Sequence, residues 1–122
     1  MSGRVLLIED NANITEALCF ILLRDGWDVE AHSDGTTAIE KLREFRPDVL
    51  VLDVMLPGRS GYEILQELRA DADFCALPVL MLTARGQERE RLTAEVGGAD
   101  LFMTKPFSNA EILANLRQLV GG

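Results

Sequence analysis

Cysteine, histidine and long apolar runs are all scarce in this sequence. Its 122 residues include two cysteines and one histidine. Cys19 and Cys75 lie far apart and outside any Cys-x-x-Cys spacing, which argues against a disulfide framework or a thiolate metal site. We expect Cys19 to be a small core residue in a helix, Cys75 to lie in a loop, and His32 to lie at the surface.

No apolar run approaches the ~18 residues that a membrane span requires. The first residues, Met-Ser-Gly-Arg, lead directly into an expected strand and leave no room for a signal peptide. The length predicts one domain over residues 1–122, and a hydrophobic content of 48% is sufficient for a substantial core. We therefore expect a cytoplasmic protein that does not associate with a membrane.

Positive charge is also in short supply. Lys and Arg together number 12 and Asp and Glu number 20, which gives a formal net charge of −8. Binding of nucleic-acid phosphates requires clustered Lys and Arg side chains. The charge balance therefore predicts no direct contact between this chain and nucleic acid.

Short apolar runs rich in β-formers alternate with amphipathic segments, a pattern that predicts βα units and a parallel sheet. Strands are expected at 4–9, 28–31, 49–52, 79–82 and 101–103. Helices are expected at 12–25, after the turn Asp34-Gly35 and before Pro47, from Ser60 onward, at 86–96 and from Ser108 onward. The segment 28–31 is short and polar on one side, which is typical of an edge strand.

The expected helices differ in how firmly the sequence anchors them. Ser60 with Glu63, and Ser108 with Glu111, fit capping boxes. The helix at 12–25 has apolar residues at core spacing, namely Ile14, Ala17, Leu18, Ile21 and Leu22. The helix at 86–96 is almost wholly charged at its start, which indicates either a weakly held element or a solvated helix with i,i+4 ion pairs.

Charged and hydroxyl side chains follow four of the expected strands. Glu9-Asp10 lies at the end of the first strand, Asp53 at the end of the third, Thr83 at the end of the fourth and Lys105 just beyond the fifth. In an open parallel sheet the carboxyl ends of the strands lie along one edge, where such folds bind ligands. The pattern therefore predicts that these side chains converge in a phosphoryl-transfer site.

Such a site needs a cation. Two carboxylates ~4 Å apart repel each other by roughly 4 kcal/mol at the effective dielectric near a protein surface. A divalent ion that prefers oxygen ligands and retains water removes this repulsion and can bridge a nucleophile and phosphoryl oxygens. We therefore expect a divalent cation beside these carboxylates.

Taken together, these residues resemble the receiver domain of two-component response regulators. The resemblance covers essentially the whole chain. It rests on five elements in the family's order, namely Glu9-Asp10, Asp53 with Pro57-Gly58, Thr83-Ala84, Phe102, and Lys105-Pro106-Phe107. It implies an α/β, flavodoxin-like, doubly wound fold of five βα units, with a five-stranded parallel sheet of order 2-1-3-4-5 and helices on both faces.

The resemblance also implies a reaction. Asp53 would take a phosphoryl group from a sensor histidine kinase or a phosphotransfer protein, so that the domain catalyses its own Mg²⁺-dependent phosphorylation and a slow autodephosphorylation. The ion would be Mg²⁺, with Mn²⁺ as a substitute, and Asp53 would contribute to its site. Asp10 would ligate the ion directly and Glu9 through water, with the backbone carbonyl of Met55 as a further ligand. Lys105 would pair with a carboxylate or phosphoryl oxygen, and Pro106 would follow a cis peptide bond.

Further roles follow from the same resemblance. Thr83 would donate its hydroxyl to the phosphoryl group, and Phe102 would move into the space that Thr83 leaves. Ala84 is small and would keep the approach to the aspartate open. Met55 and Arg85 would flank the path of the water that removes the phosphate.

The resemblance places the signalling face on the fourth helix, fifth strand and fifth helix, which would contact a protein effector or a fused output domain. Family members that dimerise there use an acid and an arginine where this chain has Leu101 and Asn115, so we expect a monomer. One alternative is a receiver-like interaction module that works without phosphorylation. Another is a flavodoxin-like small-molecule binder, which would need a Ser-, Thr- and Gly-rich loop in place of Glu9-Asp10-Asn11.

Overall fold

Five parallel strands form the centre of the computed structural model, which describes residues 3–84 and 98–121. The strand order is β2-β1-β3-β4-β5, so the order implied by the resemblance is confirmed and β2 is an edge strand. The strands are β1 (Arg4–Ile8), β2 (Asp28–His32), β3 (Val49–Asp53), β4 (Val79–Ala84) and β5 (Leu101–Lys105). Each lies within two residues of the strand expected from the sequence.

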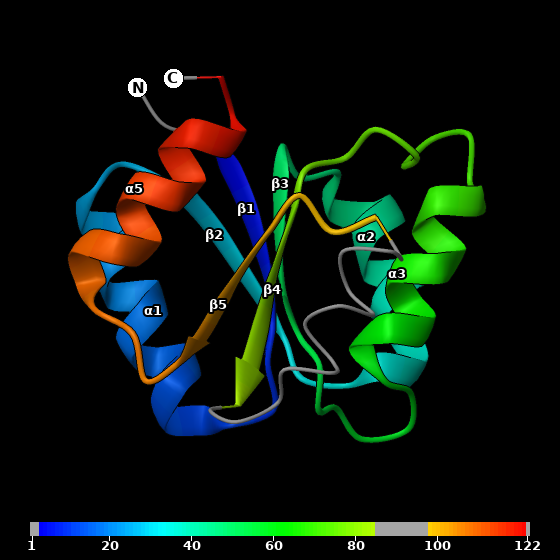
Figure 1. Cartoon of the computed structure of the whole chain (residues 1–122), viewed down its shortest axis with the longest axis horizontal. Helices are drawn as coiled ribbons and strands as arrows, with labels where there is room; N and C mark the ends of the chain where they lie inside the picture. Colours follow the sequence, from blue (N-terminus) through cyan, green and yellow to red (C-terminus); the bar gives the residue numbers. More distant parts are fainter. Residues whose placement is uncertain (1–2, 85–97, 122) are drawn as a thin grey trace.

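Helices cover both faces of the sheet (Figure 1). They are α1 (Ala12–Arg24), α2 (Ala38–Phe45), α3 (Gly61–Ala70) and α5 (Asn109–Leu119), and a short 3-10 turn, η1 (Gly35–Thr37), precedes α2. Helices α1 and α5 lie on one side of the sheet and α2 and α3 on the other. The helix expected at 86–96 lies outside the described residues.

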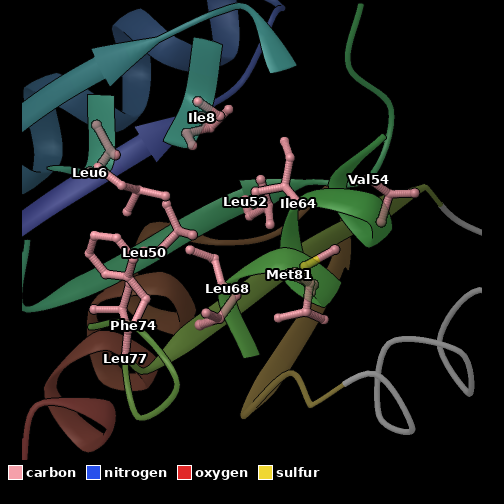
Figure 2. Packing of buried hydrophobic residues seen from close by; sticks show 14 residues of the cluster. Leu6, Ile8, Leu50, Leu52, Val54, Ile64, Leu68, Phe74, Leu77 and Met81 are labelled. Carbon is pink, nitrogen blue, oxygen red and sulfur yellow. The ribbon is translucent and has the colours of Figure 1, made fainter. Parts of the chain in front are cut away.

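Alternating strand residues divide the core into two clusters. One cluster packs under α2 and α3 and includes Leu6, Ile8, Leu50, Leu52, Ile64, Leu68 and Met81 (Figure 2). The other packs under α1 and α5 and includes Val5, Leu7, Val49, Val51, Leu18, Leu22, Ile112 and Leu116. Full burial of each such aliphatic side chain contributes roughly 1.5–3 kcal/mol. Because β1 and β3 are buried on both faces, the residues at their carboxyl ends are held in fixed positions.

Side-chain caps define where the helices begin. Ser60 and Glu63 form the expected capping box at α3. At α5 the Ser108 hydroxyl accepts from the Glu111 amide, which is one half of the expected box. At α1 the cap is Asn11, whose side-chain oxygen accepts from two backbone amides of the first turn. This cap was not among the sequence-based expectations.

Some expectations about burial need correction. Ala17 is exposed, because α1 faces the sheet through Leu18 and Leu22 and leaves Ala17 at the edge of a groove towards α5. His32 is half-buried, and its Nε2 lies 2.7 Å from Thr37 Oγ1. Cys19 is half-buried and Cys75 exposed, and both are free thiols. Among the described residues, no helix is both long and apolar enough to cross a membrane.

Candidate functional site

Three carboxylates meet at the carboxyl edge of the sheet. Asp53 is the last residue of β3, and Glu9 and Asp10 directly follow β1. The pairing of Ile8 with Leu52 brings these two strand ends side by side. One oxygen from each of the three carboxylates lies within 4.8 Å of the others. Glu9 and Asp53 are buried, whereas Asp10 is exposed and faces solvent at the mouth of the site.

The amine of Lys105 lies between two of these acids. Lys105 is the last residue of β5, and its peptide bond to Pro106 is cis. Its Nζ lies 3.1 Å from Asp53 Oδ2 and 2.9 Å from Glu9 Oε1. The side chain is 24% exposed, so the amine can reach an incoming group while it neutralises one of the buried acids.

Burial makes Glu9 an unfavourable place for a charge. Desolvation raises the pKa of Glu9, and the nearby carboxyl of Asp53 raises it further, although Lys105 and the Asn11 amide act in the opposite direction. Burial alone would lower the pKa of Lys105, but its contacts with Glu9 and Asp53 outweigh burial and raise it. The amine therefore stays charged at neutral pH and holds the two acids together.

The charges of this cluster do not balance without a further cation. Three carboxylates face one ammonium group, so a divalent ion would neutralise the remaining charge. Glu9 Oε1 also lacks a hydrogen-bond donor, because its contact with Lys105 is an ion pair without hydrogen-bond geometry. Carboxylate oxygens are the ligands that Mg²⁺ prefers. The residues present therefore fit a divalent cation.

The loop between β3 and α3 borders the site and is tied down at both ends. The Val54 amide donates to the Leu82 carbonyl at 3.1 Å, and the Gly61 amide donates to the Val54 carbonyl at 2.9 Å. A Cβ on Gly61 would lie 2.3 Å from the Asp53 carbonyl oxygen, so only glycine permits this close approach. Between these ties lies Met55, whose amide is 3.4 Å from Asp53 Oδ1 and whose side chain is exposed.

Three of the remaining residues singled out from the sequence lie on β4 and β5. Thr83 is 2% exposed, and its hydroxyl donates to the Met103 carbonyl at 3.4 Å. Phe102 is half-buried and packs against the cluster under α2 and α3. Ala84 is described only as the last residue of β4, paired with Lys105, and Arg85 lies outside the described residues.

Sequence reasoning overlooked two parts of the site. The Asn11 amide donates to Glu9 Oε2 at 3.2 Å, and the Asn11 side chain caps α1. Asn11 therefore orients both the Glu9 carboxylate and the first turn of α1. An Asn that follows a strand and precedes an apolar helical pattern is a recognisable cap, so this residue could have been found. The second part is the turn at Asp34–Thr36, which contacts the β3–α3 loop and has no comparable sequence pattern.

Comparison with known proteins gives a consistent result. The family model for the response regulator receiver domain matches residues 5–117. The phosphate regulon transcriptional regulatory protein PhoB of Escherichia coli is 39% identical over 120 residues, which cover 98% of this chain and 52% of that protein. The transcriptional regulatory protein TrcR of Mycobacterium tuberculosis is 46% identical over 117 residues, which cover 96% of this chain and 45% of that protein. The chain thus spans about half the length of these curated relatives.

Solved structures agree with this match. The receiver domain of a sensor histidine kinase from Pseudomonas aeruginosa superimposes with a TM-score of 0.90 at 28% identity and full coverage of both chains. That crystal structure has a magnesium ion coordinated in the active site cleft. The chemotaxis protein CheY4 of Vibrio cholerae gives a TM-score of 0.89 at 28% identity and covers 98% of this chain and 99% of that one.

Proposed function

This chain belongs to the response regulator receiver domain family, and from that premise we propose that Asp53 is its phosphoryl acceptor and that a sensor histidine kinase or phosphotransfer protein is the donor. The observation that carries this proposal is the pairing of Asp53 with Lys105. Asp53 is buried and accepts a hydrogen bond from the partly exposed Lys105 amine at 3.1 Å, whereas Glu9 makes only an ion pair with that amine. A nucleophile so placed can meet an incoming phosphoryl group while the amine stabilises the charge that moves onto its oxygens.

The reaction transfers one phosphoryl group. An oxygen of Asp53 attacks phosphorus, the P–N bond to the donor imidazole breaks, and its electron pair remains on that nitrogen, which then takes a proton. Lys105 donates to a phosphoryl oxygen in place of its present contact with Asp53. The buried strand β3 holds the nucleophile in a fixed position, which lowers the cost of orienting it for attack.

A divalent cation fits beside this nucleophile, and we propose Mg²⁺, with Mn²⁺ able to replace it. Glu9, Asp10, Asp53 and the backbone carbonyl of Met55 would hold the ion. When bound, it supplies charge neutralisation for the phosphoryl oxygens. The exposed Asp10 is accessible for direct ligation, and the buried Glu9 is positioned to orient a ligand water.

The test is phosphorylation by a small donor. The protein is incubated with acetyl phosphate and Mg²⁺, and its intact mass is measured with and without EDTA. We expect the mass of one added phosphoryl group only when Mg²⁺ is present, and fragment mapping should place it on Asp53. A metal-replete protein that gains no phosphoryl mass from acetyl phosphate or from a phosphohistidine donor would favour the alternative of a module that works by contact alone.

We propose that Thr83 and Phe102 relay the phosphorylation of Asp53 to the signalling face to which β5 and α5 contribute. The Thr83 hydroxyl now donates to the Met103 carbonyl at 3.4 Å, a long hydrogen bond that a phosphoryl oxygen can outcompete. Phe102 is the neighbour of Met103 on β5 and is half-buried. We expect the NMR signals of the Phe102 ring to shift on phosphorylation in the wild-type protein and to stay unchanged in Thr83→Ala.

Met55 should set how long the phosphate persists. Its exposed, apolar side chain lies two residues beyond Asp53 at the mouth of the site. An Asn there would offer groups that orient an attacking water, whereas Met excludes it. We expect Met55→Asn to dephosphorylate faster than the wild type, because a side-chain amide can hold the attacking water in a productive orientation. Equal decay of the phosphorylated mass in the two proteins would contradict this role. That Arg85 also flanks the path of the attacking water stays a prediction from the sequence.

The output of this domain belongs to the same proposal. The relatives are transcriptional regulators about twice as long as the chain, so we propose that the domain acts on a fused output domain or a separate protein effector in the cytoplasm. The charge of −8 argues that any contact with DNA is made by the output partner. The chain is still predicted to be a monomer, because Leu101 and Asn115 stand where dimerising family members have an acid and an arginine.

A further inference from the structure

Two turns that belong to non-neighbouring strands meet beside the acidic site. The turn after β2 contains Asp34–Thr36, and the loop after β3 contains Met55–Ser60. Strand β1 lies between β2 and β3, so the first turn reaches across the end of β1 to meet the second. The Gly35 amide donates to the Pro57 carbonyl at 3.1 Å and joins them.

Two glycines allow these turns to interlock. A Cβ on Gly35 would lie 2.2 Å from the backbone oxygen of Arg59, and a Cβ on Gly58 would lie 2.1 Å from Thr36 Oγ1. Gly58 also has a φ of +79°, which favours glycine. Each turn therefore presents a glycine to the other. A side chain at position 35 would push the backbone of the second turn away, and one at position 58 would displace the Thr36 side chain.

Each of the two turns is also held in place by a contact of its own. Asp34 Oδ1 accepts from the Thr36 amide at 2.8 Å and caps η1, which stiffens the first turn. The Arg59 guanidinium lies 2.6 Å from Glu67 of α3, which anchors the second. We call this contact between residues 34–36 and 57–59 the interlock. It joins two segments that are each held in place, so a displacement of one would displace the other.

We propose that the Asp34–Thr36 turn is a positioning element for the cation site, because it fixes the loop that carries the Met55 carbonyl. The loop is tied at Val54 and at Gly61, and the interlock adds a third fixed point at 57–59. Only Met55 and Leu56 lie between the first and third of these points, so the direction of the Met55 carbonyl follows from them. The inference rests on the proposed function in taking that carbonyl as a ligand.

The test measures Mg²⁺ affinity in the unphosphorylated protein. Mg²⁺ alone is titrated into wild type and Gly58→Ala, and the shifts of backbone amide signals near Asp10 and Met55 give the dissociation constant. We expect Gly58→Ala to bind Mg²⁺ about tenfold more weakly, as is usual when support for a metal ligand is lost. The matched control is Gly26→Ala, since Gly26 also has a positive φ, +92°, but lies between α1 and β2. It should lose similar stability and keep its Mg²⁺ affinity within about twofold.

A second substitution separates the contact from the backbone strain. In Gly58→Ala, removing the Thr36 hydroxyl relieves the clash with the added methyl group but leaves the positive φ at position 58 unchanged. Thr36→Ala added to Gly58→Ala should therefore recover at least about threefold in affinity. Thr36→Ala added to Gly26→Ala should recover nothing. If the loss in Gly58→Ala is under twofold, or if the double variant shows no recovery, the inference is wrong.

Failure to fold and failure to bind metal have separate meanings. If Gly58→Ala does not fold, the Thr36→Ala single variant tests the inference instead. A loss of about two- to threefold in its Mg²⁺ affinity would support the positioning role, and an unchanged affinity would overturn it. If the folded wild-type protein itself binds no Mg²⁺, the proposed metal site fails, and the positioning role fails with it. If the wild type binds Mg²⁺ and the variants bind equally well, only the positioning role fails.

Discussion

Asp53→Asn is expected to gain no phosphoryl mass from acetyl phosphate under conditions in which the wild-type protein is fully modified. An amide oxygen is a far weaker nucleophile than a carboxylate, and the substitution also removes one of the charges that would hold the cation. Asn has nearly the same size as Asp, so the fully buried strand β3 can keep its packing. The measurement is intact mass after matched incubation with Mg²⁺.

Asp48→Asn is the matched control, because Asp48 directly precedes β3, at the opposite end of the strand from Asp53. Its carboxylate accepts from the Arg4 amide at 2.8 Å and has no contact with the acidic site. The control variant should be phosphorylated as fully as the wild type. Phosphoryl transfer that survives in Asp53→Asn and maps to another acid would contradict the assignment of the nucleophile.

Asp53→Asn has a second expected effect, which appears in the absence of metal. Asp53 raises the pKa of Glu9, so its replacement should lower that pKa. When folding raises the pKa of a carboxyl group, the folded protein becomes less stable as the pH rises through that pKa, because ionisation is more costly in the folded state. The thermal stability of Asp53→Asn in EDTA should therefore exceed that of the wild type at neutral pH, and the difference should shrink towards pH values at which Glu9 is protonated.

The sequence was most informative where burial and strand direction act together. The runs Val5–Ile8 and Val49–Leu52 are apolar at every position, which indicates central strands of a parallel sheet. Once such strands are parallel, Asp53 must lie at the same edge as Glu9 and Asp10. The structure places one oxygen of each carboxylate within 4.8 Å of the others, although Asp53 is far from Glu9 and Asp10 along the chain.

Contacts between distant turns were not predictable in the same way. Gly35 follows a short strand and Gly58 follows a proline, so each was expected to be an ordinary turn residue. Their common role arises because the β2–α2 turn crosses the end of β1, a feature of tertiary geometry that no periodicity records. Ala17 is a similar case, since its spacing matches the apolar stripe of α1 but the stripe is wider than the part that the sheet covers.

Lys105→Met is expected to lower the rate of phosphorylation by roughly a hundredfold while Asp53 remains present. In the described part of the chain the Lys105 amine is the charged donor that contacts the nucleophile, and methionine keeps the length of the side chain without its charge. Binding of Mg²⁺ should persist or become tighter, because the acids lose a competing cation. A slow reaction with intact metal binding therefore distinguishes loss of transition-state stabilisation from loss of the site.

The matched control is Lys41→Met. Lys41 also contacts two carboxylates, Glu30 at 3.4 Å and Glu44 at 3.7 Å, and its side chain is 20% exposed compared with 24% for Lys105. It lies on α2, and the acids it contacts are outside the acidic site. Lys41→Met should be phosphorylated at the wild-type rate, so a similar loss in both variants would mean that the charge of the protein, and not the place of the amine, controls the reaction.

Stability provides an independent check on Lys105, because the amine now separates two buried acids. Without it, Glu9 and Asp53 lose their shared counterion, and the metal-free variant should be less stable than wild type by about 1–3 kcal/mol at neutral pH. Lys105 is a partner that lowers the pKa of Glu9, so its removal should raise that pKa further. The destabilisation must then diminish as the pH falls and Glu9 takes up a proton. A loss of stability in EDTA that is equal at acid and neutral pH would show that Lys105 contributes packing and not charge, and would remove the electrostatic basis of the site.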